Sequence, residues 1–279
     1  MKKQAIVTGG TRGIGKEICR QLLAQDFDIT FIGRDKASGA AIQEELQASF
    51  PDSSVTYLYG DLGTIASCKK LATDIQGQAD KIDLLINNAG IWPTQLSTNS
   101  DGLEMAFMVN HLAPLILTKE LLPNIQKAEN SRIVNVNAGL YLKGKVSTEE
   151  TPYGKDFHKI KTYCNTKLCN ILATLEIADK LEGSGTTINA LHPGVIKTGL
   201  GDFGGIMGLL LSLVKNFWKS PDQGAVAPVW LATAPELEGV NGKYYNEKKV
   251  EEISGQATEA EIRKDMWNKS LELADLSWN

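Results

Sequence analysis

The chain has few of the residues that build metal centres and disulfide scaffolds. Only three histidines and four cysteines occur among 279 residues. His111, His158 and His192 show no ligand-like spacing, and no two cysteines form a C-x-x-C pair. The sequence therefore predicts no catalytic metal, and it predicts reduced thiols in a cytoplasmic protein.

Long apolar runs and a large charge excess are also missing. The longest apolar stretch, Gly204–Trp218, is interrupted by Lys215 and Asn216 and is too short to cross a bilayer comfortably. A strand pattern begins almost at the first residue, which leaves no room for a signal peptide ahead of it. A net charge of −4 argues against a large nucleic-acid surface. We therefore expect no nucleic-acid partner and no transmembrane segment.

Short β-branched runs alternate with helical patterns along almost the whole chain. This alternation predicts an α/β fold in which a doubly wound parallel sheet of about seven strands carries helices on both faces, the Rossmann fold. No linker-like composition shift occurs, so residues 1–279 are expected to form a single domain. Strands are predicted at 5–9, 27–33, 54–61, 82–90, 132–138, 186–194 and 242–246, and helices at 12–25, 37–49, 65–76, 103–126, 158–181, 222–233 and 258–274.

A glycine-rich loop, TGGTRGIG, joins the first predicted strand to the first predicted helix. Gly9, Gly13 and Gly15 have the spacing G-x-x-x-G-x-G. Glycines at a helix start let a phosphate approach the backbone N–H groups, which side chains would block. A simple turn needs one glycine, and this stretch has four. The loop therefore predicts a dinucleotide site.

The end of the second predicted strand indicates which dinucleotide binds. An acidic residue there would bind a ribose 2′-hydroxyl, whereas arginine suits a 2′-phosphate. Gly33 occupies the expected acidic position, and Arg34 follows it, while Arg12 lies in the glycine loop. Two guanidinium groups can hold a phosphate, although Asp35 offers Arg34 another partner. We therefore favour NADP(H) over NAD(H).

These motifs resemble those of the short-chain dehydrogenase/reductases over nearly the whole chain. The matching stretches are TGGTRGIG, NNAG at 87–90, YCNTK at 163–167 and HPGVIKT at 192–198, and two longer segments look most like the retinol-dehydrogenase-like branch. The resemblance implies an NADP(H)-dependent oxidoreductase acting on lipophilic carbonyls or alcohols. It implies cofactor contacts at Gly9, Thr11, Arg12, Gly13, Ile14, Gly15, Arg34, Asp61, Leu62, Asn88, Ala89, Gly90, Tyr163, Lys167, Pro193, Gly194 and Thr198.

Tyr163 and Lys167 form the predicted catalytic pair. They are four residues apart, so a helix places them on one face. An ammonium beside a phenol favours phenolate and is expected to lower its pKa from about 10 toward working pH. Asn110 matches the family position that kinks a helix and holds a relay water near the lysine. An incidental Tyr–Lys pair and a capping asparagine are the plainer alternatives.

Ala138 stands where the family has its catalytic serine. Losing one donor to the substrate oxygen costs roughly 10²–10³ in rate, which favours a slow enzyme over an inactive one. Three explanations stay open at this point. Ala138 is an introduced Ser→Ala change, the chain is a natural variant without fast turnover, or a nearby donor substitutes. The candidate donors are Asn137, Tyr141, Ser147 and Thr148.

Residues of about 199–220 are rich in glycine and large apolar side chains, and we expect a substrate-binding lid there. A buried helix or partner-binding face is the alternative. Residues of about 257–279 are predicted to contain a polar C-terminal helix.

The leading function is a carbonyl reductase or alcohol dehydrogenase. A catalytically inactive cofactor-binding sensor or scaffold and a C=C reductase are the alternatives. The resemblance implies pairing through the helices of Asn110 and Tyr163 into a homodimer or homotetramer.

Overall fold

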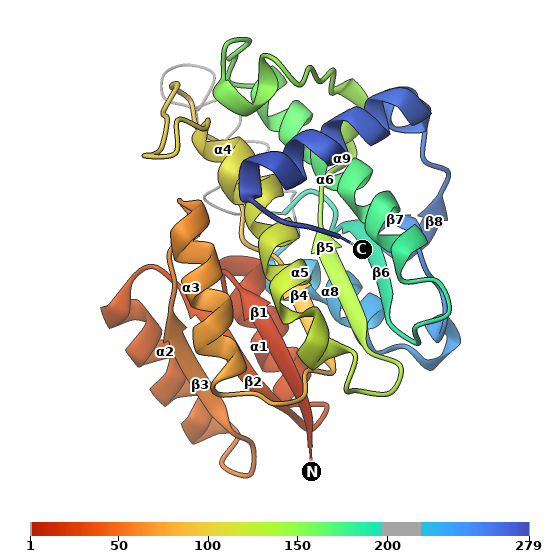
Figure 1. Ribbon diagram of the computed structural model, residues 1–279. Coiled ribbons are helices and arrows are strands. Elements are labelled where there is room, and N and C mark those ends of the chain that lie inside the picture. Colours follow the sequence, from red (N-terminus) through yellow and green to blue (C-terminus); the bar gives the residue numbers. More distant parts are fainter. Residues whose placement is uncertain (1, 197–218, 279) are drawn as a thin grey trace.

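An eight-stranded sheet forms the centre of the protein (Figure 1), seen in a computed structural model that describes residues 2–196 and 219–278. The strand order is β3-β2-β1-β4-β5-β6-β7-β8, and every pairing is parallel except that of β7 with β8. This confirms the doubly wound fold. The strands are β1 (Lys3–Thr8), β2 (Phe27–Gly33), β3 (Val55–Tyr59), β4 (Leu84–Asn87), β5 (Arg132–Val136), β6 (Thr187–His192), β7 (Tyr244–Asn246) and β8 (Lys249–Glu251).

The eighth strand was not predicted. It has only three residues, two of them charged, and so carries no apolar run that would indicate a strand. A tight turn at Glu247, which has a positive φ of 56°, folds β8 back onto β7 as an antiparallel edge. The prediction of about seven strands therefore missed a short hairpin partner.

Helices cover both faces of the sheet, as predicted. Successive strand residues point to opposite faces. Ile6, Leu85 and Ile133 pack toward one apolar core, and Val7 and Ile86 pack toward the other. The helices are α1 (Gly13–Leu23), α2 (Lys36–Ser49), α3 (Ile65–Gln76), α4 (Met105–Phe107), α5 (Ala113–Ile125), α6 (Lys161–Lys180), α8 (Pro221–Thr233) and α9 (Ala260–Ala274), with short 3-10 turns at Gly139–Lys143, Thr151–Tyr153, Pro235–Leu237 and Gly255–Thr258.

The long helix predicted at 103–126 is not continuous. A π-helical segment, Met108–Leu112, separates α4 from α5. Pro114 has no N–H and cannot donate to the carbonyl of Asn110 four residues earlier, so the regular α-helical bond is lost here. The freed Asn110 carbonyl accepts instead from the Asn170 side chain at 3.3 Å. A π-bulge of this kind often marks a functional site.

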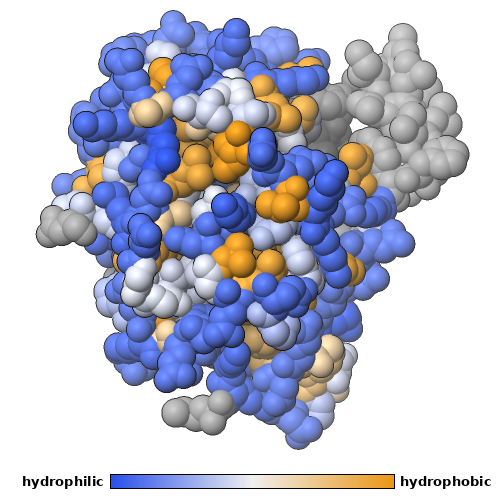
Figure 2. All heavy atoms as spheres, turned by 90° about the vertical axis from the view of Figure 1, so that its right-hand side faces the viewer, coloured by the Kyte–Doolittle hydropathy of each residue, from blue (hydrophilic) through white to orange (hydrophobic). Residues whose placement is uncertain are grey.

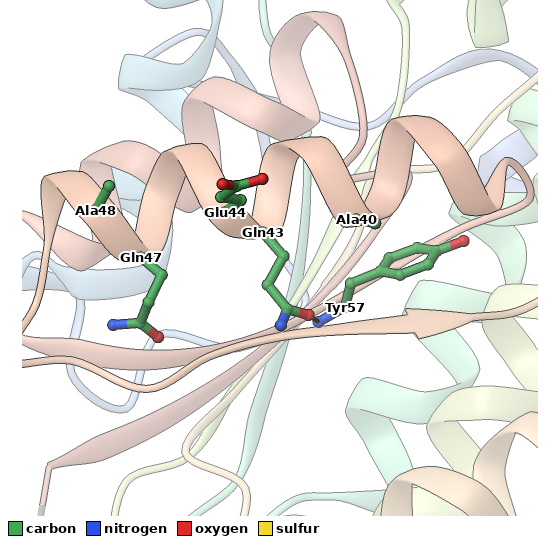
Figure 3. A pocket seen from close by; sticks show the side chains of 6 residues that line it. All are labelled: Ala40, Gln43, Glu44, Gln47, Ala48 and Tyr57. Carbon is green, nitrogen blue, oxygen red and sulfur yellow. Dashed lines mark hydrogen bonds between the residues drawn. The ribbon is translucent and has the colours of Figure 1, made fainter.

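Helix α2 shields one edge of the sheet. Its Gln43 and Gln47 accept from the backbone N–H groups of Tyr57 at 2.6 Å and Val55 at 3.2 Å in the edge strand β3 (Figure 3). Four residues of helix rise about 6 Å and two residues of strand about 6.6 Å, so the two spacings match. The two glutamines also line the groove between these elements, together with Ala40, Glu44, Ala48 and Tyr57 (Figure 3).

The C-terminal helix α9 packs on α6 and on the π-helical segment. His111 Nε2 lies 2.7 Å from the Ser270 hydroxyl oxygen. Because that hydroxyl donates its hydrogen to the Met266 carbonyl, His111 is the donor in this hydrogen bond. Arg263 pairs with Glu176 of α6. Helix α9 therefore lies against α6 and against the helical segment of Asn110, the two elements through which subunit pairing was predicted. The homodimer or homotetramer stays a prediction.

Hydrophobic residues form separate patches on the face toward β7 and β8, surrounded by hydrophilic residues (Figure 2). Val250 in β8 is one of the exposed large hydrophobic side chains, with 56% of its surface exposed. Within residues 2–196 and 219–278, no helix combines the length and the apolar character that crossing a membrane requires. The four cysteines are buried and free.

Candidate active site

A cleft of about 800 Å³ opens at the carboxyl ends of the central strands. This is where ligands bind in doubly wound sheets. The cleft is lined by the glycine loop, the ends of β2, β4, β5 and β6, and α6. It brings together Gly9, Thr11, Arg12, Gly13, Ile14, Gly15, Arg34, Asp61, Leu62, Asn88, Ala89, Gly90, Ala138, Tyr163, Lys167, Pro193 and Gly194. Thr198, also predicted to bind cofactor, lies outside the described residues.

The glycine loop is shaped for a phosphate group. Gly9 and Gly13 have positive φ values of 71° and 55°, which side chains disfavour. A Cβ on Gly15 would lie 2.1 Å from the Gly9 carbonyl oxygen, so no larger residue fits there. Helix α1 begins after Arg12 without any side-chain cap, which leaves its first N–H groups available to an anion. The loop therefore fits a dinucleotide pyrophosphate.

Asn88 and Thr8 tie the glycine loop to the end of β4. The Asn88 amide donates to the Thr8 carbonyl at 3.0 Å, and the Thr8 hydroxyl accepts from the backbone N–H groups of Asn88 and Ala89, each at 3.0 Å. Two walls of the cleft are thus held together by hydrogen bonds that do not depend on a ligand.

Arg12 and Arg34 lie exposed at the cleft, and neither forms an ion pair within the described part of the chain. Among the described residues Asp35 forms no ion pair with Arg34, and its carboxylate instead caps α2 by accepting from the Ser38 N–H at 2.7 Å. That hydrogen bond holds the pKa of Asp35 below its usual value. A Cβ on Gly33 would lie 2.4 Å from the Thr11 methyl, so an acidic side chain at the end of β2 would require Thr11 to move.

Tyr163 and Lys167 are buried side by side on α6, and each is 5% exposed. The Lys167 ammonium donates to the Val136 carbonyl at 3.1 Å and lies 5.7 Å from the Tyr163 ring centre. Burial lowers the pKa of Lys167 to about 8. Burial also raises the pKa of Tyr163, and the ammonium does not outweigh this effect. The expectation of a lowered tyrosine pKa in the protein alone was therefore wrong.

Asn110 lies behind the cleft wall and is buried, so it is not a solvated cap. Its amide oxygen accepts from the Ile91 N–H at 2.8 Å, and its amide nitrogen donates to the Ile91 carbonyl at 2.9 Å and the Thr166 hydroxyl at 3.1 Å. The side chain thereby joins the NNAG loop to α6. Its amide oxygen and its main-chain carbonyl each accept one hydrogen bond here, from the Ile91 N–H and the Asn170 side chain, and each can accept a second.

Ala138 lines the cleft just after β5, in extended backbone. Neighbouring Asn137 also lines the cleft, but both its amide hydrogens are engaged, with the Lys167 carbonyl at 3.1 Å and Asn170 Oδ1 at 2.9 Å. Of the other candidate donors, Tyr141, Ser147 and Thr148, none lies among the described residues that line the cleft. The structure therefore brings no predicted substitute to the position of the missing hydroxyl.

Trp92 is a site residue that the sequence did not indicate. It follows NNAG by two positions, lines the cleft and stacks on Tyr163, with ring centres 4.1 Å apart and planes within 5°. No spacing rule connects residues 92 and 163, so this contact could not be read from the sequence. His192 also lines the cleft, where burial lowers its pKa. No group of acidic, histidine or cysteine side chains in the described ranges could hold a metal ion.

Comparison with protein families decides the relationship. The family described as short chain dehydrogenase matches residues 3–203. The chain belongs to the short-chain dehydrogenases. Human retinol dehydrogenase 13 is 34% identical, over 98% of this chain and 85% of its own length. This confirms the resemblance to the retinol-dehydrogenase-like branch, and the chain is an oxidoreductase of this family.

Solved structures share the fold along most of the chain. A protein from Mycobacterium Paratuberculosis superposes with a TM-score of 0.79 at 22% identity and covers 99% of this short-chain dehydrogenase, which spans 95% of that chain. A blue fluorescent protein from a metagenomic library, solved in complex with NADPH, has a TM-score of 0.70 and 25% identity. The match covers 88% of this chain and 95% of that protein's chain. The fold and its NAD(P) cleft are therefore typical of the family.

Proposed function

We propose that this protein is an NADP(H)-dependent reductase or dehydrogenase that interconverts a lipophilic carbonyl compound and its alcohol. The observation that carries the proposal is one shared cleft. It holds the glycine loop, the buried pair Tyr163 and Lys167, and two arginines that form no ion pair with the residues the structure describes. When bound, the nicotinamide cofactor supplies or accepts a hydride.

Tyr163 is the proposed acid in reduction and base in oxidation. Its raised pKa keeps the phenol protonated at neutral pH, which suits donation to a carbonyl oxygen. Lys167, charged below about pH 8, stabilises the phenolate that remains after donation. Asn110 holds the Ile91 backbone against α6 and so fixes the wall beside both residues.

The cofactor is proposed to be NADP(H), not NAD(H). Arg12 and Arg34 are free to hold a 2′-phosphate, since Asp35 is occupied by the cap of α2. NAD(H) is usually selected by a carboxylate at the end of β2. Here that position is Gly33, and the Thr11 side chain lies against it. Asp61, Asn88 and Gly90 are proposed to contact the adenosine and ribose groups, and Thr198 the carboxamide.

A lipophilic substrate is supported by the apolar sequence of 199–220 and by the retinol dehydrogenases among the relatives. We propose this segment as a lid, and all of it before residue 219 lies outside the described residues. Ala138 is expected to lower the rate by about 10²–10³ relative to a serine-containing site. Tyr163, Lys167 and the cofactor residues remain, so we expect slow turnover, not its loss.

The test is to follow NADPH absorbance at 340 nm with retinal and a series of aliphatic and aromatic aldehydes and ketones, identifying each product. Alcohol products with lipophilic substrates would support the proposal. Saturation of a C=C bond instead would favour the C=C reductase. Tight NADPH binding without any product would favour a cofactor-binding sensor.

A further inference from the structure

Trp92 covers one face of the Tyr163 ring. The stack is close and nearly parallel, at 4.1 Å and 5°, and Tyr163 is 5% exposed. Within residues 2–196 and 219–278, no group forms a hydrogen bond with the Tyr163 hydroxyl. The Trp92 ring, together with the Lys167 ammonium 5.7 Å from the Tyr163 ring centre, therefore limits where the phenol can lie.

Trp92 is itself held in place from the other end of the cleft wall. Its indole N–H donates to the Lys159 carbonyl at 2.5 Å, in the loop that leads into α6. The ring thus spans from the NNAG loop to the start of the helix that carries Tyr163. A change in either segment would be transmitted to the phenol through the stacked pair.

We propose that Trp92 is a positioning residue that holds the Tyr163 phenol toward the substrate oxygen in a site where Ala138 offers no second hydroxyl. The proposal rests on the proposed function. With two hydroxyls, a substrate oxygen is held from two sides and helps to align the tyrosine. With one hydroxyl, alignment depends on the protein, and small misplacements of a reacting group are costly in rate. Stacked aromatic pairs supply a specific geometry beyond the area they bury.

The first test replaces Trp92 and measures carbonyl reduction. Trp92→Ala is expected to lower kcat about three- to tenfold while the Kd for NADPH stays unchanged, as loss of one aromatic pair predicts. Trp92→Phe keeps a ring and is expected to lose about twofold. Trp230 on α8 is the matched control, since it also bonds a neighbour through its indole N–H (Glu236, 2.8 Å) and contacts a tyrosine (Tyr245). Trp230→Ala should leave kcat unchanged. An unchanged kcat in Trp92→Ala would overturn the proposal.

A second test separates positioning from simple structural support. In the Ala138→Ser background, the substrate oxygen regains a second donor, so the effect of Trp92→Ala on kcat should shrink to about twofold or less. A purely structural role would give the same loss in both backgrounds and would overturn the proposal.

A third readout does not need activity. Trp92→Leu and Tyr163→Leu should each remove the near-UV circular dichroism signal that arises from the stacking of the two rings, and Trp230→Leu should not. Persistence of that signal in either of the first two variants would overturn the contact. Absence of turnover in the unmodified protein would refute the proposed function, whereas this measurement would still decide whether the contact exists.

Discussion

The two ends of the cleft are built in different ways. At the dinucleotide end, glycines and backbone hydrogen bonds fix the walls so closely that a single Cβ on Gly15 would collide at 2.1 Å. At the reacting end, side chains determine the geometry, through Lys167 on the Val136 carbonyl and Trp92 on Tyr163. The first end has the predicted glycine motif, and the second has Ala138 at the position where we predict the family's serine. Binding and turnover should therefore respond separately to substitution.

The largest separation is expected from Tyr163→Phe. Removing the phenol should lower kcat by about 10²–10⁴, because the proton donor is lost. The phenyl ring can still stack on Trp92, so the Kd for NADPH, measured by fluorescence titration, should change little. Tyr153→Phe, outside the cleft, serves as the control. Comparable losses of binding and turnover in Tyr163→Phe would contradict the division into two ends.

Ala138→Ser tests the reacting end in the opposite direction. A hydroxyl at this position should raise kcat by about 10²–10³, the contribution of one preorganised donor. The measurement is steady-state reduction of the best aldehyde, with Ala66→Ser on the exposed face of α3 as the control. No increase would mean that another group already serves the substrate oxygen or that the serine is not needed.

Arg34→Ala tests the dinucleotide end. Loss of a charge-assisted hydrogen bond should weaken NADPH binding about tenfold or more and leave NADH binding nearly unchanged. The ratio of the two Kd values is the quantity to compare. Arg20→Ala, whose side chain pairs with Glu45 on the surface away from the cleft, is the control. Equal weakening of both cofactors would remove the argument for a 2′-phosphate site.

The smallest effect is a pH dependence confined to the reacting end. Lys167, with a pKa of about 8, is charged below that pH and neutral above it, whereas the phenol of Tyr163 stays protonated. Carbonyl reduction should therefore fall about tenfold per pH unit above pH 8. Lys167→Arg keeps the charge and should remove this decline, so a decline that persists unchanged in the variant would assign it elsewhere. The lowered lysine pKa also makes folding stability rise with pH from about 8 to the ordinary value of 10.5.

Much of the dinucleotide end could be predicted, because backbone conformation and helix starts leave clear signals in sequence. The glycine loop, β2 with its bounds Phe27–Gly33 and α3 with its bounds Ile65–Gln76 were all predicted correctly. These are local features in which residue type and conformation are directly linked.

Much less of the reacting end could be predicted, because it depends on contacts between distant segments and on burial. The stack of Trp92 on Tyr163 joins residues 71 positions apart. The resemblance implied a helix kink at Asn110, but the π-helical form of that kink depends on Pro114 and on Asn170 lying near the freed carbonyl. The pKa of Tyr163 is raised and not lowered, because desolvation by burial outweighs the effect of the nearby ammonium. Burial of this side chain could not be read from the sequence.

Gln43 and Gln47 have a consequence beyond the cleft. An unprotected edge strand is a template on which strands of other molecules can add, one after another, toward fibres. In this protein the outward N–H groups of Val55 and Tyr57 are already taken by glutamine amides from α2. At β3, side chains of α2 thus occupy the backbone donors that an added strand would need.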